Sequence, residues 1–312
     1  MSIVHHIVYR QMMKSKVLYS AEHKSDYKEE RKKERLLAER VPLPRNVKIK
    51  EDKLGNILVE YVTKKENPED RILFYIHGGG FVLGEPKTRR AFTIYLADKM
   101  GYNVVAVNYR LAPEAPFPAG SSDCLQAYEE ILKQYDAEKI LFVGESAGGN
   151  LVLSTLLQAK EKNLPLPAAV FAIAPTLQYD QEFPSYTENL NTDCMVGYLS
   201  EEVCDEYLQS REEEVLHNPI AAPYYGDYAG CPPIYLWVSS SEVLRDDSIF
   251  LYEKLKKEKQ PCNLYIRKNM LHTYITIPII PEAKKDLKIM KQLVDDAMKG
   301  RASRENKWVD LK

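Results

Sequence analysis

No stretch of this 312-residue sequence is apolar over the roughly 18 residues that a membrane-spanning helix needs. The first residues, MSIVHHIVYRQMMKSKVLYS, contain no uninterrupted apolar segment and no evident cleavage site, so we expect no signal peptide. A large excess of positive or negative charge is also missing, because the 43 Lys and Arg residues nearly balance the 45 Asp and Glu residues and leave a formal net charge of −2. Such a balance provides no strong field for nucleic acid or an anionic membrane, and we expect neither as a partner.

Paired cysteines are lacking as well. The chain has five cysteines, an odd number, and no two of them are spaced C-x-x-C. This pattern argues against a disulfide framework and a zinc site, and it fits a reducing compartment. We therefore expect a cytoplasmic protein without a bound metal. The sequence leaves the oligomeric state open, a homo-oligomer included.

What the sequence does contain is a regular alternation of strands and helices. An antiparallel opening hairpin is expected from VKIKED and NILVEYV. From residue 71, buried runs predict further strands: RILFYIH, NVVAVNY, KILFVG, AAVFAIA, PIYLWVSS and NLYIRK. Helices are predicted at 87–100, 122–135, 147–161, 246–259 and 282–299. This order is typical of an α/β protein with a mostly parallel sheet covered on both faces, in which ligands sit at the carboxyl ends of the strands.

Two segments depart from that alternation. Residues 1 to about 45 mix apolar positions at helical spacing with charged stretches such as KEERKKER, and a pair of prolines ends them. Residues 178–230 are rich in Tyr, Glu, Asn and Pro, and a helix is expected near 200–213. α/β chains of this length often form one domain, so we predict a single domain over 1–312 with the second segment lying above the sheet.

A serine between two glycines is the first candidate for chemistry. Gly144-x-Ser146-x-Gly148 lies between the strand run KILFVG and a predicted helix, which is the pattern of a nucleophile elbow. The turn is so tight that side chains two residues on either side would clash with backbone, and it leaves the serine hydroxyl exposed. The motif is short, and a plain glycine-rich turn is its alternative interpretation. The strand before it and the helix after it favour Ser146 as a nucleophile.

The tetrapeptide HGGG at 77–80 follows an earlier predicted strand. Consecutive glycines let backbone N–H groups approach a substrate oxygen, and a tetrahedral intermediate needs such donors fixed in advance. HGGG accompanies G-x-S-x-G in lipases and esterases. We expect an oxyanion hole in which Gly79, Gly80 and Ala147 donate and Gly78 shapes the turn. A phosphate-binding loop is the alternative, but no Gly-Lys-Ser/Thr sequence follows.

The chain order Ser, then Asp or Glu, then His guides the choice of base and acid. His77 precedes the serine and is expected to be structural. Of the two later histidines, His272 follows the last predicted strand, where the base belongs, whereas His217 falls in the segment 178–230. Glu242 follows PIYLWVSS directly and is the expected acid.

Two further carboxylates follow Glu242 closely. Asp246 and Asp247 stand beside the next predicted helix, and capping that helix is the alternative role for either of them.

These blocks together resemble the hormone-sensitive-lipase-like family of bacterial esterases, within the α/β-hydrolase fold. The resemblance rests on HGGGFVLG, YRLAPEAPFPA, GESAGG, SSSEVLRDD and NMLHTY, and it covers roughly residues 70–275. It implies a helical cap contributed by about 1–45 and about 178–230, a small-molecule ester substrate with a short or medium acyl chain, and no metal or organic cofactor. The sequence departs from the family twice: Glu242 stands where Asp is usual, and Thr273 stands where Gly usually follows the histidine.

The expected activity is therefore ester hydrolysis by a serine carboxylesterase, through a Ser-His-Glu triad and an acyl-enzyme. Two alternatives stay open. The same machinery could cleave amides or peptides, although the chain has no room for the propeller-sized extra domain of large oligopeptidases. A non-catalytic ligand receptor on the same fold would have lost a triad member, whereas Ser146, a carboxylate and His272 are all present.

Overall fold

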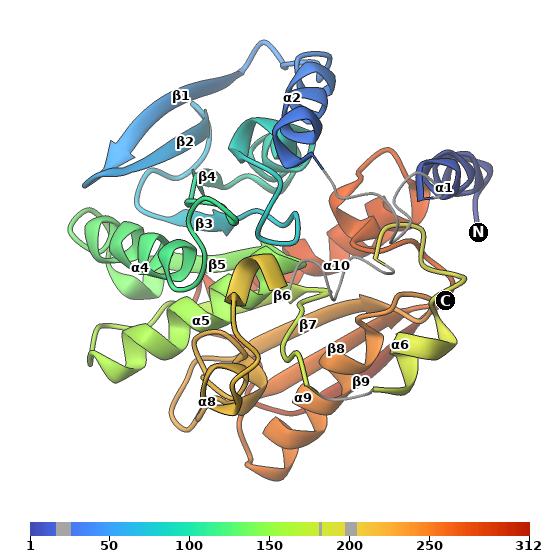
Figure 1. Ribbon diagram of the computed structural model, residues 1–312. Helices are drawn as coiled ribbons and strands as arrows, with labels where there is room; N and C mark the ends of the chain where they lie inside the picture. The colour runs from blue at the N-terminus through green and yellow to red at the C-terminus, as the bar shows by residue number, and fades with distance from the viewer. Residues whose placement is uncertain (17–25, 181–182, 197–204) are drawn as a thin grey trace.

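A nine-stranded sheet runs through the computed structural model, which describes residues 1–16, 26–180, 183–196 and 205–312 (Figure 1). The strand order is β1-β2-β4-β3-β5-β6-β7-β8-β9. Strands β3 to β9 are parallel to one another. Strands β1 and β2 form the antiparallel hairpin expected from the sequence, and β2 also pairs antiparallel with β4. Among the described residues, no helix is long and apolar enough to cross a membrane.

The strands form where the sequence predicts them, because the central runs are buried on both faces. Every residue of β3, β4, β5, β6, β7 and β8 is buried. The strands are β1 (Val47–Leu54), β2 (Ile57–Lys64), β3 (Ile72–Ile76), β4 (Asn103–Val107), β5 (Ile140–Glu145), β6 (Ala169–Ile173), β7 (Ile234–Ser239), β8 (Cys262–Arg267) and β9 (Lys307–Leu311).

Helices cover both faces of this sheet. In Figure 1, α4, α5 and α9 lie in front of it and α10 lies behind it. The helical elements that belong to the alternation are η1 (Pro86–Arg89), α3 (Arg90–Tyr95), η2 (Leu96–Met100), α4 (Ala119–Ile131), η3 (Ala137–Lys139), α5 (Ala147–Glu161), α9 (Arg245–Lys257), η5 (Tyr274–Thr276) and α10 (Pro281–Ala297). All five predicted helices are therefore present, with ends shifted by a few residues and with the first one divided into η1, α3 and η2.

The two segments outside the alternation form short helices. These are α1 (Ile3–Lys16), α2 (Tyr27–Ala38), α6 (Pro184–Glu188), α8 (Glu213–Leu216) and η4 (Pro223–Tyr225). Helix α2 is held against the loops after β3 and β4, because Arg31 donates to the carbonyl oxygens of Val82 and Ala112 at 2.8 and 2.7 Å. Figure 1 shows α2 beside the β1–β2 end of the sheet and α1 farther along it.

Two expectations from the sequence need correction. The expectation of one continuous helix near 200–213 is wrong in the described part of that range. Residues 205–208 are helical, but Gln209 has a φ of 52° and ends the helix, and α8 begins only at Glu213. Residues 197–204 lie outside the described part of the chain. Strand β9 was not expected, since KWVDL is short and follows a polar stretch, yet it pairs in parallel with β8 at the edge of the sheet.

Candidate active site

Ser146 occupies the sharp turn between β5 and α5. Its backbone has φ 55° and ψ −122°, a conformation that costs energy in any residue with a side chain. The flanking glycines are required by sterics, because a Cβ on Gly144 would overlap the carbonyl of Gly148 and one on Gly148 would overlap that of Ile76. The turn therefore holds a half-buried serine at the N-terminus of a fifteen-residue helix, where developing negative charge is favoured.

The HGGG loop packs directly against this turn. A Cβ built on Gly78 would lie 2.6 Å from the Glu145 carbonyl oxygen and 3.0 Å from the Ser146 Cβ, so only glycine fits there. The Gly78 N–H donates to the Glu145 carboxylate at 2.9 Å. Gly78 thus serves to shape the turn, and its N–H is already used.

Three other backbone N–H groups face no protein acceptor. The amides of Gly79, Gly80 and Ala147 donate no hydrogen bond to any described residue. Gly79 and Gly80 have φ values of 122° and 61° and are partly exposed, whereas Gly78 is buried. The two partly exposed glycine amides and the first amide of α5 are therefore the unused donors beside Ser146.

Glu145, the residue before the serine, fixes the two motifs to each other. Its carboxylate accepts from the Tyr75 hydroxyl at 2.5 Å, the Gly78 N–H at 2.9 Å and the Arg89 guanidinium at 2.9 Å. Arg89 also lies 3.6 Å from Glu34 of α2, so the network reaches the N-terminal segment. Sequence reasoning missed this group, because the middle residue of G-x-S carries no signal of its own.

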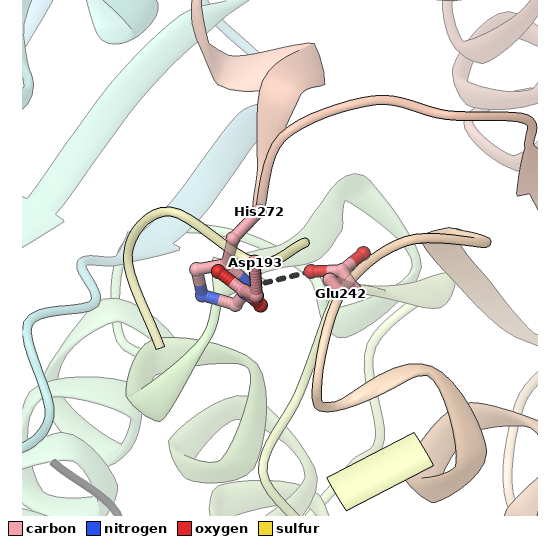
Figure 2. A group of neighbouring side chains, drawn as sticks. All are labelled: Asp193, Glu242 and His272. Carbon is pink, nitrogen blue, oxygen red and sulfur yellow. Dashed lines mark hydrogen bonds and ion pairs between the residues drawn. The ribbon is translucent and has the colours of Figure 1, made fainter. Parts of the chain in front are cut away.

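Glu242 and His272 meet at the ends of neighbouring strands, β7 and β8. The Nδ1 atom of His272 shares a hydrogen bond with Glu242 Oε2, drawn as a dashed line in Figure 2. The other oxygen of Glu242 accepts from the Ser239 N–H at the end of β7. His272 Nε2 is buried and has no hydrogen-bond partner among the described residues. Because the strands are parallel, this pair lies at the same edge of the sheet as Ser146.

The electrostatics of the pair favour a protonated imidazole. Burial disfavours the charged ring, but the charge and hydrogen bond of Glu242 outweigh it, so the pKa of His272 lies above its ordinary value. Burial also raises the pKa of Glu242, against the pull of the imidazole.

Thr273 takes the left-handed conformation, with φ 52° and ψ 25°. Glycine adopts this conformation without strain and threonine does not. The family's usual glycine therefore fits the backbone at this position better than Thr273 does.

The two aspartates after Glu242 have other tasks. The N-cap of α9 is Leu244, and no side-chain cap hydrogen bond is described there, so the alternative role of Asp246 or Asp247 as the cap is wrong. Asp246 instead accepts from the Ser185 N–H at 2.8 Å and pairs with Arg245. Asp247 accepts from the Leu177 N–H and the Tyr186 hydroxyl, both at 2.8 Å, and burial raises its pKa to about 7.

Three further histidines, His77, His217 and His5, make contacts of their own. His77 is fully buried and stacks on Tyr109 with ring centroids 4.4 Å apart, and burial lowers its pKa to about 3. His217 pairs with Asp180 at 2.6 Å. His5 of α1 accepts from the N–H of Leu271 at 3.3 Å, so the N-terminal helix touches the loop that carries His272.

Comparisons with known proteins agree with this fold and site. Residues 73–276 match a family described by its alpha/beta hydrolase fold. An acetyl-hydrolase of Streptomyces hygroscopicus is 30% identical over 239 residues, which are 76% of this chain and 79% of that protein. An esterase of Acinetobacter venetianus is 28% identical over 249 residues, covering 77% and 80% of the two chains.

A solved structure gives the same result. The crystal structure of an esterase from the bacterial hormone-sensitive lipase family superposes with a TM-score of 0.87 at 26% identity, covering 97% of this chain and 100% of that one. The chain belongs to the alpha/beta-hydrolase family matched by residues 73–276, within the hormone-sensitive-lipase-like esterases. It is a carboxylic-ester hydrolase.

Proposed function

We propose that this hydrolase cleaves short- to medium-chain acyl esters, acetyl esters among them, through a Ser146-His272-Glu242 triad and an acyl-enzyme. The observation that carries the proposal is the buried hydrogen bond between Glu242 and His272 Nδ1, while Nε2 of the same ring has no partner in the described part of the chain. A serine held in a strained turn at the same edge of the sheet provides the nucleophile.

In the first half of the reaction, His272 Nε2 accepts the Ser146 proton as the serine oxygen attacks the ester carbonyl. Glu242 holds the imidazole in the tautomer with the proton on Nδ1 and stabilises the imidazolium that forms. The oxyanion of the tetrahedral intermediate accepts hydrogen bonds from the Gly79, Gly80 and Ala147 amides. His272 then returns its proton to the departing alkoxide, and an acyl-serine remains.

Water completes the cycle by the same steps. His272 takes a proton from the water as its oxygen attacks the acyl carbon, and then protonates Ser146 as the acid leaves. The requirement at each attack is a neutral imidazole.

Activity is expected to fall as the pH is lowered through the pKa of His272. An unperturbed histidine titrates near about 6.5. Because Glu242 raises the pKa of His272, the acidic limb should lie above that value. The measurement is kcat/KM for a soluble ester from pH 5 to 9. A midpoint below about 6 in a stably folded enzyme would show that the base is another group.

The substrate class rests on the segments proposed as a cap. The described parts of residues 1–45 and 178–230 contact the loops at the carboxyl ends of the strands. For example, the Tyr207 ring stacks on the Phe81 ring, with the two ring centroids 3.7 Å apart. The second segment is rich in Tyr, Glu and Asn and has no long apolar face. The acetyl-hydrolase among the relatives supports a short acyl group.

Acyl-chain length tests this proposal directly. Each methylene buried in a matching channel contributes about 0.8 kcal/mol, so an enzyme for long chains needs a long apolar channel. We expect kcat/KM to be highest for soluble acetate or butyrate esters and to fall with longer chains. The measurement is a series of p-nitrophenyl esters, with a long-chain triglyceride emulsion for comparison. Faster hydrolysis of the emulsion would overturn the assignment.

A further inference from the structure

A second carboxylate lies beside the Glu242–His272 pair. Asp193, in the segment 178–230, is 1% exposed. One of its carboxylate oxygens lies within 4.8 Å of a ring nitrogen of His272 and of a Glu242 carboxylate oxygen. Figure 2 shows Asp193 and Glu242 around the same imidazole ring, with the dashed hydrogen bond reaching Glu242 only.

Backbone donors hold the Asp193 carboxylate in this place. Its Oδ2 accepts from the N–H of Val243, the residue after Glu242, at 2.8 Å. Its Oδ1 accepts from the N–H groups of Met195 and Val196, both at 2.9 Å. One oxygen is therefore bound to its own segment and the other to the loop that carries Glu242. A carboxylate that accepts from several N–H groups is stabilised in its charged form.

The Asp193 charge acts in the same direction as that of Glu242. A negative charge near a buried imidazole favours the imidazolium, and the water-poor surroundings screen the interaction only weakly. Asp193 accordingly raises the pKa of His272, after the larger effects of burial and Glu242.

We propose that Asp193 is a positioning residue for the reaction, which fixes the Glu242 loop through the Val243 N–H and adds a second negative charge beside the imidazolium of His272. The inference rests on the proposed function, since it requires His272 to be the base. On this proposal Asp193 acts through His272 and the Glu242 loop, and it contacts neither the serine nor the substrate. Its effect should therefore appear in kcat and in the pH profile, not in KM.

Several other groups determine the charge at this place. Among the described residues, the titratable groups facing His272 are Glu242, Asp193 and Glu145, and those facing Asp193 include Glu242 and Tyr9 of α1. Glu145 is compensated by its contact with Arg89. Because Glu145 and Glu242 remain in place, removing Asp193 should weaken the stabilisation of the imidazolium without abolishing it.

The test is Asp193→Asn, measured as kcat and KM from pH 5 to 9 on a soluble acetate ester. We expect kcat to fall by about tenfold at its optimum, KM to stay unchanged, and the acidic midpoint to move to lower pH. Both oxygens of Asp193 accept from backbone N–H groups, so the amide nitrogen of an asparagine must face one of these donors. Asp193→Ser is therefore measured in parallel, because serine removes the charge without introducing an amide nitrogen. Asp180→Asn is the matched control, since this carboxylate of the same segment bonds to His217 and Tyr225 instead.

The outcomes separate this inference from the proposed function. If kcat falls in both Asp193 variants while the midpoint of the acidic limb of the pH profile does not move, Asp193 is only a structural part of the loop. That result would overturn the inference. Wild-type kinetics in a folded variant would overturn it as well. Ser146→Ala is run beside them: if it loses activity while the Asp193 variants behave as wild type, the triad stands and only the inference fails. If Ser146→Ala stays active, the proposed function itself fails.

Discussion

Replacing Ser146 with alanine is expected to abolish ester hydrolysis, with a loss of about 10⁶ in turnover, because the acyl-enzyme can no longer form. The fold should persist. Alanine keeps the Cβ and therefore adds no new strain at φ 55°, and the elbow is held by backbone contacts such as the Ser146 N–H to the Ile173 carbonyl at 2.8 Å. The measurements are kcat for a soluble ester and the melting temperature. Activity near that of the wild type in a pure, folded preparation would falsify the proposed mechanism.

A fluorophosphonate probe provides the control for this experiment. Such reagents react with an activated serine, so the wild-type chain should be labelled at Ser146 and the alanine variant should not. The same reagent distinguishes an enzyme from a ligand receptor on this fold. A receptor would remain unlabelled even with the serine present.

Glu242→Gln is expected to reduce turnover by about 10⁴ with little change in melting temperature. Glutamine keeps the shape of the side chain but can present its amide nitrogen to His272 Nδ1, which favours the wrong tautomer and removes the charge that stabilises the imidazolium. The measurement is kcat at saturating substrate, together with a thermal melt.

Asp246→Asn is the matched substitution in the same loop. Its carboxylate bonds to the Ser185 N–H and to Arg245, not to His272. The variant should lose about 1 kcal/mol or more of stability and keep most of its activity, because one buried donor is left facing an amide. Exchanged phenotypes would make Asp246 the acid. If both variants stayed active, Asp193 would be the remaining buried carboxylate within reach of His272.

The central sheet was predictable because its strands are buried on both faces and read as continuous apolar runs. The helices between them were equally clear, and α5 begins and ends where the pattern placed it, at residues 147 and 161. Strand β9 escaped prediction since it is half exposed at the sheet edge, where Lys307 and Trp308 face solvent and no apolar run forms. An edge strand is specified by its partner β8 more than by its own residues.

The candidate site shows the same division. Ser146, the glycine loop and His272 follow from local motifs and chain order, and Glu242 follows from its distance to the end of a strand. Asp193 meets the Glu242–His272 pair, and Arg89 meets Glu145, only because packing brings together residues that lie far apart in sequence. No spacing of residues within a short stretch of sequence predicts such contacts. The capping role expected for Asp246 was wrong for a related reason, because the competing donor, Ser185, belongs to a distant segment.

The strand order has a consequence for how the chain is made. From β6 to β9 each strand lies next to the one that precedes it in sequence, and β5 lies next to β3. The edge strands therefore leave the ribosome in the order in which they stand in the sheet, while a domain generally folds as a unit. Ser146, Glu242 and His272 would then leave the ribosome in that order. A nascent chain would be inert until β8 and its following loop had been made and the whole sheet could form.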